Sequence, residues 1–241
     1  MSNTEVQTED IINFLKSELS FREVYQQILT QRIIAKYAEE KSIAVSEAEI
    51  QAEANQQRRK LRLEKASDTL NWLSQQMITP ADWEVGIRNR LLAQKLAESM
   101  FAQDVERFFI QNRLEFEQVV LYQMIVADDK LAQELYYQIE EGETSFYDAA
   151  HQYDIDSTRR QKCGYEGVLY RWAIAPDIAT LVFSSIPQQL IGPIKTEQGY
   201  HLLIVEEKIP AELTPQRYQE ILQQMFKQWL NTQIESLLSQ S

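Results

Sequence analysis

Apolar residues recur three or four positions apart throughout the stretch Glu9–Gln111, for example at Val24 and Ile28. This spacing places apolar side chains on one face of an α-helix. Ser46-Glu47-Ala48-Glu49 has the sequence of a capping box, and Thr79-Pro80-Ala81-Asp82 combines a cap, a first-turn proline and an acidic third residue. The first part of the chain is therefore predicted to be a series of amphipathic helices.

The pattern changes beyond Phe116 to short apolar runs that are separated by turns. Gly86 is the only glycine before residue 142, and the other five glycines lie between Gly142 and Gly199. The runs predict a strand at 119–126, helices at 128–141 and 144–153, and a loop at 154–167. They further predict an extended segment at 168–171, a helix from 176 and a hairpin at 191–205. This segment is predicted to be a mixed α and β unit.

The hairpin at 191–205 surrounds His201, one of two histidines in the chain. Gly192-Pro193 begins its first strand, where a missing N–H is tolerated. Glu197-Gln198-Gly199 supplies a turn whose glycine can adopt a positive φ. The residues after His201 form an apolar run rich in strand formers.

A last helix is predicted to begin after Leu213-Thr214-Pro215. Its apolar stripe consists of Tyr218, Ile221, Leu222, Met225, Trp229, Ile234 and Leu237. Such a stripe needs a partner surface, so we expect the helix to pack on the N-terminal helices. The predicted domains are 1–115 (helical), 116–209 (mixed) and 210–241 (C-terminal helix).

Composition excludes several classes of protein. The net charge of −12 argues against binding to a nucleic-acid backbone, and no stretch reaches the roughly 18 apolar residues of a membrane helix. Cys163 is the only cysteine, which excludes an intramolecular disulfide and a cysteine-based zinc site. The acidic N-terminal sequence lacks the features of a secretory signal, so a cytoplasmic location is expected.

Two further features favour ordinary structural interpretations. The basic cluster Arg58-Arg59-Lys60-Leu61-Arg62 lies among acidic residues and is interpreted as a solvated helix face. His151 has no metal-ligating residue at a suitable spacing, so no metal site is predicted. The sequence also lacks phosphate-binding loops and nucleophile motifs, which leaves hydrolysis and group transfer without support.

The order of elements from Glu117 to Lys208 resembles the parvulin family of peptidyl-prolyl cis/trans isomerases. The similarity is strongest at Phe183–Val205, where Ile-Gly-Pro-Ile-Lys-Thr, a glycine turn and Tyr-His precede an apolar strand. Tyr153-Asp154-Ile155-Asp156-Ser157 and two glycines agree more weakly, and the flanking helices resemble SurA/PrsA-type foldases. The resemblance implies an α+β fold: a four-stranded antiparallel sheet with helices, inserted in a helical SurA-N-like domain that the C-terminal helix completes.

The resemblance also implies which residues form the site. His201 corresponds to the second histidine of the family, Asp156 to its acidic or thiol residue and Thr196 to its hydroxyl, whereas Gln123 stands at the first-histidine position. Asp156 is expected to keep the His201 imidazole protonated or to fix its tautomer. The implied substrate-binding residues are Ile174, Ile178, Gln198 and Phe183.

The implied function is prolyl isomerisation, or a foldase and chaperone role, on proline-containing unfolded or peptide clients. No cofactor is expected, because the obstacle is amide resonance, with a barrier of about 18–20 kcal/mol. Gln123 in place of a histidine predicts weak catalysis. The alternative is a non-catalytic adaptor that presents peptides to modification or secretion machinery. Taken alone, His201 also fits a structural histidine and Asp156 an ordinary Asx turn.

Overall fold

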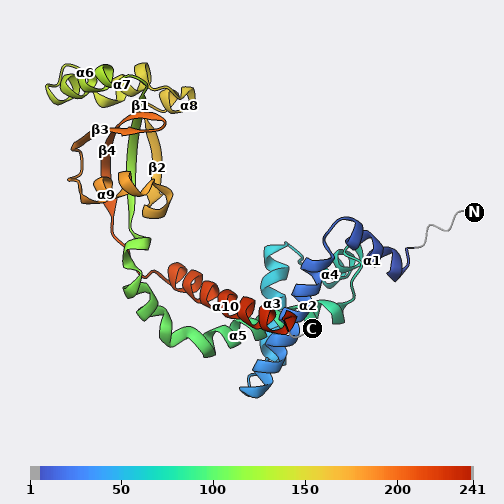
Figure 1. Ribbon diagram of the computed structural model, residues 1–241. Helices are drawn as coiled ribbons and strands as arrows, with labels where there is room; N and C mark the ends of the chain where they lie inside the picture. The colour runs from blue at the N-terminus through green and yellow to red at the C-terminus, as the bar shows by residue number, and fades with distance from the viewer. Residues whose placement is uncertain (1–5, 240–241) are drawn as a thin grey trace, which may run out of the picture. The chain divides into compact units, whose positions relative to one another are not determined.

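The computed structural model describes residues 6–239, which divide into two compact units. The first unit contains the described residues up to Val105 and those from Tyr218 onward. The second unit, Glu106–Arg217, interrupts the first along the chain. Figure 1 labels the α-helices and strands of both units.

The first unit is helical. Its elements are α1 (Thr8–Ser17), α2 (Phe21–Glu40), α3 (Glu47–Lys60), α4 (Ala66–Gln75), and most of α5 (Pro80–Gln111) and α10 (Pro215–Leu238). The Glu49 carboxylate accepts the Ser46 N–H at 2.8 Å, and the Thr79 hydroxyl accepts the Asp82 N–H at 3.1 Å. Both predicted N-terminal caps are therefore confirmed.

Helix α10 packs within this unit through its apolar stripe. The Trp229 ring meets Tyr37 edge-on with 4.9 Å between ring centroids, and Phe226 meets Phe101 in the same manner at 6.5 Å. The Tyr37 hydroxyl also donates to the Gln233 side-chain oxygen at 2.9 Å. The buried side chains of α10 are Ile221, Leu222, Phe226, Leu230 and Ile234. The C-terminal helix thus completes the helical unit, as the fold prediction required.

The second unit is built on a four-stranded antiparallel sheet. In the order of the sheet, its strands are β2 (Tyr165–Tyr170), β1 (Gln118–Val126), β4 (Gly199–Ile209) and β3 (Leu190–Thr196). The other elements are η1 (Arg113–Phe116), α6 (Asp129–Glu140), α7 (Phe146–Tyr153), α8 (Ser157–Gln161), η2 (Arg171–Ala173) and α9 (Pro176–Ser184). The predicted α+β fold class is confirmed.

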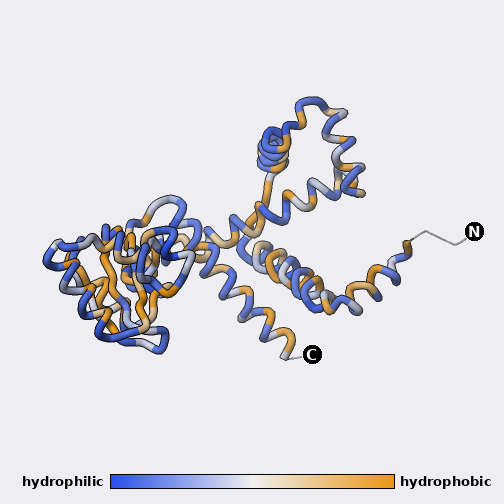
Figure 2. Tube along the Cα trace, turned by 90° about the horizontal axis from the view of Figure 1, so that it is seen from above, coloured by the Kyte–Doolittle hydropathy of each residue, from blue (hydrophilic) through white to orange (hydrophobic). Residues whose placement is uncertain are grey.

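Alternate residues of the two central strands enter separate apolar clusters on the two faces of the sheet. Met124 and Leu202 pack with Leu135 of α6 and with α7, whereas Leu121 and Leu203 pack with α9. Figure 2 shows the strands of this unit as mainly apolar and the helices as alternately polar and apolar. Both faces of the sheet are covered, so the central strands are buried over most of their length.

The prediction of a loop at 154–167 is wrong for two segments. Residues Ser157–Gln161 form the short helix α8, and β2 begins at Tyr165. The side chain of Asp156 accepts the Arg159 N–H at 2.8 Å and so caps α8. A helix of five residues is too short for an apolar period to reveal.

No helix within residues 6–239 combines the length and apolarity needed to cross a lipid bilayer.

Candidate active site

His201 lies near the start of β4 and is held by the hairpin that precedes it. The imidazole is 3% exposed, and its Nε2 lies 2.7 Å from the Thr196 hydroxyl oxygen. That oxygen also accepts the Gln198 backbone N–H at 3.1 Å. The turn therefore fixes the hydroxyl, and the hydroxyl in turn fixes the imidazole. The structure brings together three predicted site residues: His201, Thr196 and Gln198.

The first strand of the hairpin approaches His201 closely because it contains Gly192. The β3–β4 pairing is irregular between Ile191 and Ile194 and resumes with Ile194 opposite His201. Gly192 has a φ of +121°, and a Cβ atom there would collide with the His201 carbonyl oxygen. Glycine alone fits both the backbone angle and the close approach.

Gln123 shares a sheet face with His201 but is not its direct partner. In the β1–β4 register, Gln123 lies opposite Leu203, and Ile125 lies opposite His201. Residues opposite each other, and residues two apart on one strand, have side chains on the same face. Gln123 is consequently a diagonal neighbour of His201. Gln123 is therefore close enough to belong to the site, but the residue directly opposite His201 is Ile125.

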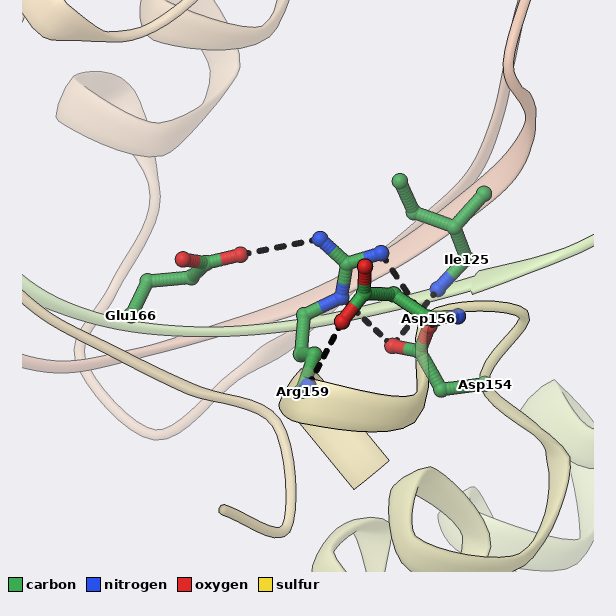
Figure 3. A network of polar contacts seen from close by, with 5 residues as sticks. All are labelled: Ile125, Asp154, Asp156, Arg159 and Glu166. Atoms are coloured by element: carbon green, nitrogen blue, oxygen red, sulfur yellow. Dashed lines mark hydrogen bonds and ion pairs between the residues drawn. The ribbon is translucent and has the colours of Figure 1, made fainter. Parts of the chain in front are cut away.

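A buried ion pair lies beside this part of β1 (Figure 3). The Arg159 Nε donates to Asp154 Oδ2 at 2.6 Å, its Nη2 donates to Asp154 Oδ1 at 3.1 Å, and its Nη1 donates to Glu166 at 3.0 Å. The Asp154 carboxylate also accepts the Ile125 N–H at 3.3 Å. Because Ile125 faces His201, the ion pair is connected to the site through the backbone of β1.

Asp156 has a different role from the one predicted. Its carboxylate accepts a hydrogen bond from the Arg159 backbone, and its own N–H donates to Asp154 Oδ1 at 2.8 Å. The hydrogen bond from the Arg159 backbone lowers the pKa of the Asp156 carboxyl. The structure thus does not bring Asp156 together with His201. The acidic side chain whose charge affects the pKa of the His201 imidazole is Asp154.

The predicted apolar residues lie on the same sheet face as His201 and differ in burial. Ile178 is a residue of α9, is 4% exposed and belongs to the core between this helix and the sheet. Ile174 and Phe183 are half-buried and pack against this core. The Arg171 guanidinium carbon lies 4.3 Å from the centre of the Phe183 ring, so a cation covers one face of that ring. Ile174 is therefore better placed than Ile178 or Phe183 to meet a ligand.

The pKa of His201 is lowered, which reverses the expected effect of an acidic neighbour. Burial is the largest cause, because it disfavours the imidazolium form. The Arg159 cation acts in the same direction, and Asp154 opposes both. The expectation that Asp156 keeps the imidazole protonated is therefore wrong, and the site holds a neutral imidazole at pH 7.

This shift predicts a pH dependence of stability. The folded-state pKa of His201 lies below the ordinary histidine value of 6.5, so the unfolded chain binds more protons than the folded chain as the pH falls below that value. Stability contributed by the neutral imidazole is present above pH 6.5 and is lost as the pH falls through the folded pKa. His201→Gln is expected to show a smaller loss of stability between pH 7.5 and 5.5 than the parent in urea unfolding.

The matched control is His151→Gln, because His151 is the other histidine and is exposed. It should keep the pH dependence of the parent. Equal pH dependence in the parent and in His201→Gln would contradict the assignment.

Sequence reasoning missed Asp154 and Arg159. The Asp154-Ile155-Asp156 segment offers two carboxylates, and the resemblance selected the second. The available signal was the capping rule: an aspartate directly before a helical turn satisfies backbone N–H groups and stays at the surface. That rule assigns Asp156 to the cap and leaves Asp154 for the interior, where a nearby arginine is needed as a partner.

The second unit combines the sheet order β2-β1-β4-β3, helices on both faces and a buried His201–Thr196 pair. Residues 125–207 match the family model described as the PPIC-type PPIase domain of the rotamase family. This segment is therefore similar to parvulin-type domains, and the arrangement of a mixed unit within a helical one is similar to that of PrsA and SurA, as the resemblance implied.

Two relatives are similar to different shares of the chain. The foldase protein PrsA of Caldanaerobacter subterraneus subsp. tengcongensis is 22% identical over 205 residues, which cover 83% of this chain and 60% of the relative. A putative peptidyl-prolyl cis-trans isomerase SurA of Haemophilus influenzae is 32% identical over 94 residues, 39% of this chain and 29% of the relative. The matches thus span less than two thirds of either relative.

A solved structure has the same fold. The peptidylprolyl isomerase PrsA from Bacillus cereus matches 98% of this chain and 88% of its own, with 14% identity and a TM-score of 0.50.

Proposed function

We propose that this chain is a foldase that binds unfolded, proline-containing polypeptides and promotes cis/trans isomerisation of their Xaa-Pro bonds. The observation that carries this proposal is the buried His201–Thr196 pair at 2.7 Å. It places a preorganised hydrogen-bonding group on a sheet face whose other residues are mainly apolar. Such a surface suits the apolar proline ring and the partly desolvated amide beside it.

Prolyl isomerisation needs this kind of site rather than a nucleophile. The planar amide is stabilised by resonance, and rotation passes through a twisted state about 18–20 kcal/mol higher. A site accelerates rotation when it binds the twisted amide more tightly than either planar form. An apolar surface that removes water, together with fixed hydrogen-bonding groups, provides this preference.

Catalysis in this chain is proposed to be weak. Gln123 occupies the position where the resemblance places the first histidine, and its amide donates and accepts hydrogen bonds but does not titrate. The remaining polar groups of the site are a neutral imidazole and one hydroxyl. These two groups can orient an amide. They provide fewer hydrogen bonds to the twisted amide than a site with two histidines would.

An isomerisation assay at low temperature tests the proposal, because the uncatalysed reaction takes tens of seconds or longer. The parent chain is expected to accelerate isomerisation of a proline tetrapeptide. His201→Ala should reduce this acceleration by about tenfold or more, since removing one preorganised donor costs on the order of 10²–10³ in other enzymes. Gln123→His should increase it.

His151→Ala is the control, because it removes the exposed histidine of α7 and should keep the parent rate. A parent rate equal to that of buffer, with no gain in Gln123→His, would contradict the isomerase proposal.

The second candidate function is a non-catalytic adaptor that presents proline-containing segments to peptide modification or secretion machinery. Two observations together favour it. Gln123 cannot titrate, and the charged groups of Asp154 and Arg159 beside His201 pair with each other. Retained binding of a proline peptide without any acceleration would favour the adaptor. The cytoplasmic location stays a prediction that fractionation of expressing cells would test.

A further inference from the structure

Two open cavities lie in the first unit, one lined by α3, α4 and α5 and the other by α3 and the loop that follows it. One, of about 260 Å³, is mainly apolar, and its lining includes Ile50, Leu70 and Trp83. The other, of about 380 Å³, is lined by three arginines together with Asn55, Leu63 and Glu64. Arg58 lines both cavities, and the two cavities together are called the groove.

The apolar half of the groove is a built surface. The Trp83 indole N–H donates to the Gln57 side-chain oxygen at 2.9 Å, and its ring packs edge-on against Trp72 with 6.0 Å between centroids. These contacts fix the ring. Leu70, by contrast, leaves 56% of its surface exposed. A fixed aromatic wall beside an exposed aliphatic side chain suits one bulky apolar side chain of a ligand.

The basic half carries guanidinium groups with unused hydrogen-bonding capacity. Arg58 donates one hydrogen bond to the Glu64 carbonyl oxygen at 3.3 Å, but its Nε is buried and has no partner among the described residues. Arg59 and Arg62 are exposed; Glu64 is the carboxylate that lines this cavity, and Glu84 lines the apolar one. The interpretation as a solvated helix face therefore fails for Arg58. An unpaired buried donor of this kind is rare and favours an anionic ligand.

We propose that this groove binds an unfolded polypeptide segment in which a bulky apolar side chain is followed by an acidic one. The inference rests on the proposed foldase function and names the segment that the helical unit selects. The apolar side chain would lie against Trp83 and Leu70, and the carboxylate would reach the arginines, whose planar groups pair with carboxylates through two hydrogen bonds. The chain as a whole has a net charge of −12, so this attraction is a property of the groove rather than of the surface at large.

The test measures binding of short labelled peptides to the full chain by fluorescence anisotropy. The probe is Gly-Ser-Trp-Asp-Glu-Ser-Gly, and the comparison peptide has Asn-Gln in place of Asp-Glu. Neither contains proline, so neither depends on the isomerase site. The acidic peptide is expected to bind about tenfold more tightly, and this advantage should decrease with added salt.

Three variants separate the two halves of the groove. Arg59→Gln/Arg62→Gln should abolish most of the preference for the acidic peptide, and both positions are exposed, so the fold should be retained. Lys60→Gln removes a neighbouring charge that does not line either cavity and should keep the preference. Leu70→Asn should weaken binding of both peptides.

Equal affinity for the two peptides in the parent would overturn the proposal, as would an equal loss in Lys60→Gln and in the double arginine variant. Displacement of the acidic peptide by single-stranded RNA at lower concentration than by unlabelled peptide would reassign the groove to nucleic acid. A parent that accelerates prolyl isomerisation but fails to bind the probe would overturn the groove alone and leave the proposed function intact. Unchanged probe binding in His201→Ala would support the separation of the two sites.

Discussion

Replacing Arg159 by methionine is expected to lower the free energy of unfolding of the second unit by about 3–5 kcal/mol, because it leaves a buried carboxylate without its cation. The Asp154 side chain is 0% exposed, and that of Arg159 is 15% exposed. Methionine keeps much of the length of the arginine side chain, so the loss reports mainly on charge. Hydrogen exchange of the β1 and β4 amides measures the effect within this unit.

The Asp154 carboxylate binds two backbone N–H groups as well as the arginine. It accepts the N–H groups of Ile125 and Asp156, which join the end of β1 to the start of α8. An unpaired charge at this place would be relieved by protonation or by local opening, and either would release both backbone segments. Protection of the Ile125 amide should therefore fall most.

A double variant and a surface control test this explanation. Asp154→Asn/Arg159→Met removes both charges and keeps one side-chain carbonyl oxygen, which can accept one of the two backbone N–H groups, so it should be more stable than Arg159→Met alone. Lys162→Met removes an exposed cation just after α8 and should change stability by less than about 0.5 kcal/mol. A double variant no more stable than Arg159→Met would show that the ion pair is not the source of the loss.

The elements of both units could be predicted because their signals are local. Thr79, Ser46 and Pro176 mark helix starts through capping chemistry, and the turn at Gly199 fixes the hairpin. These signals depend on residues within four positions of one another. These local signals therefore indicated the order of elements and the hairpin that holds His201, whereas the four-stranded antiparallel sheet was implied by the family resemblance.

The partners of His201 could not be predicted in the same way, because they depend on register and burial. A shift of one residue in β1 would exchange Gln123 and Ile125 for residues of the opposite face. Asp154 and Asp156 lie two positions apart, and only the end of α7 and the start of α8 decide which of them is buried. The groove beside Arg58 likewise needs three helices to be placed before it exists.

Replacing Gly192 by alanine is expected to disturb both stability and the site. Its φ of +121° is unfavourable for a residue with a side chain, at a cost of about 1–3 kcal/mol. The added Cβ would also collide with the His201 carbonyl oxygen and would lie 3.2 Å from a Leu202 methyl group. Overpacking of this kind costs about 1–3 kcal/mol more. The expected loss, measured by hydrogen exchange of the sheet, is the sum of the two effects.

Gly167→Ala separates the collision from the backbone strain. Gly167 belongs to the same unit and also has a positive φ, of +92°, but a Cβ there would meet no atom within 4 Å. This variant should therefore show the strain alone. Because the colliding atom in Gly192→Ala belongs to His201 itself, strand β4 must shift there to relieve the contact, and prolyl isomerisation should fall together with stability. Gly167→Ala should lose stability and keep the parent isomerisation rate. Equal effects of the two substitutions on stability and rate would mean that Gly192 is needed for its backbone angle alone.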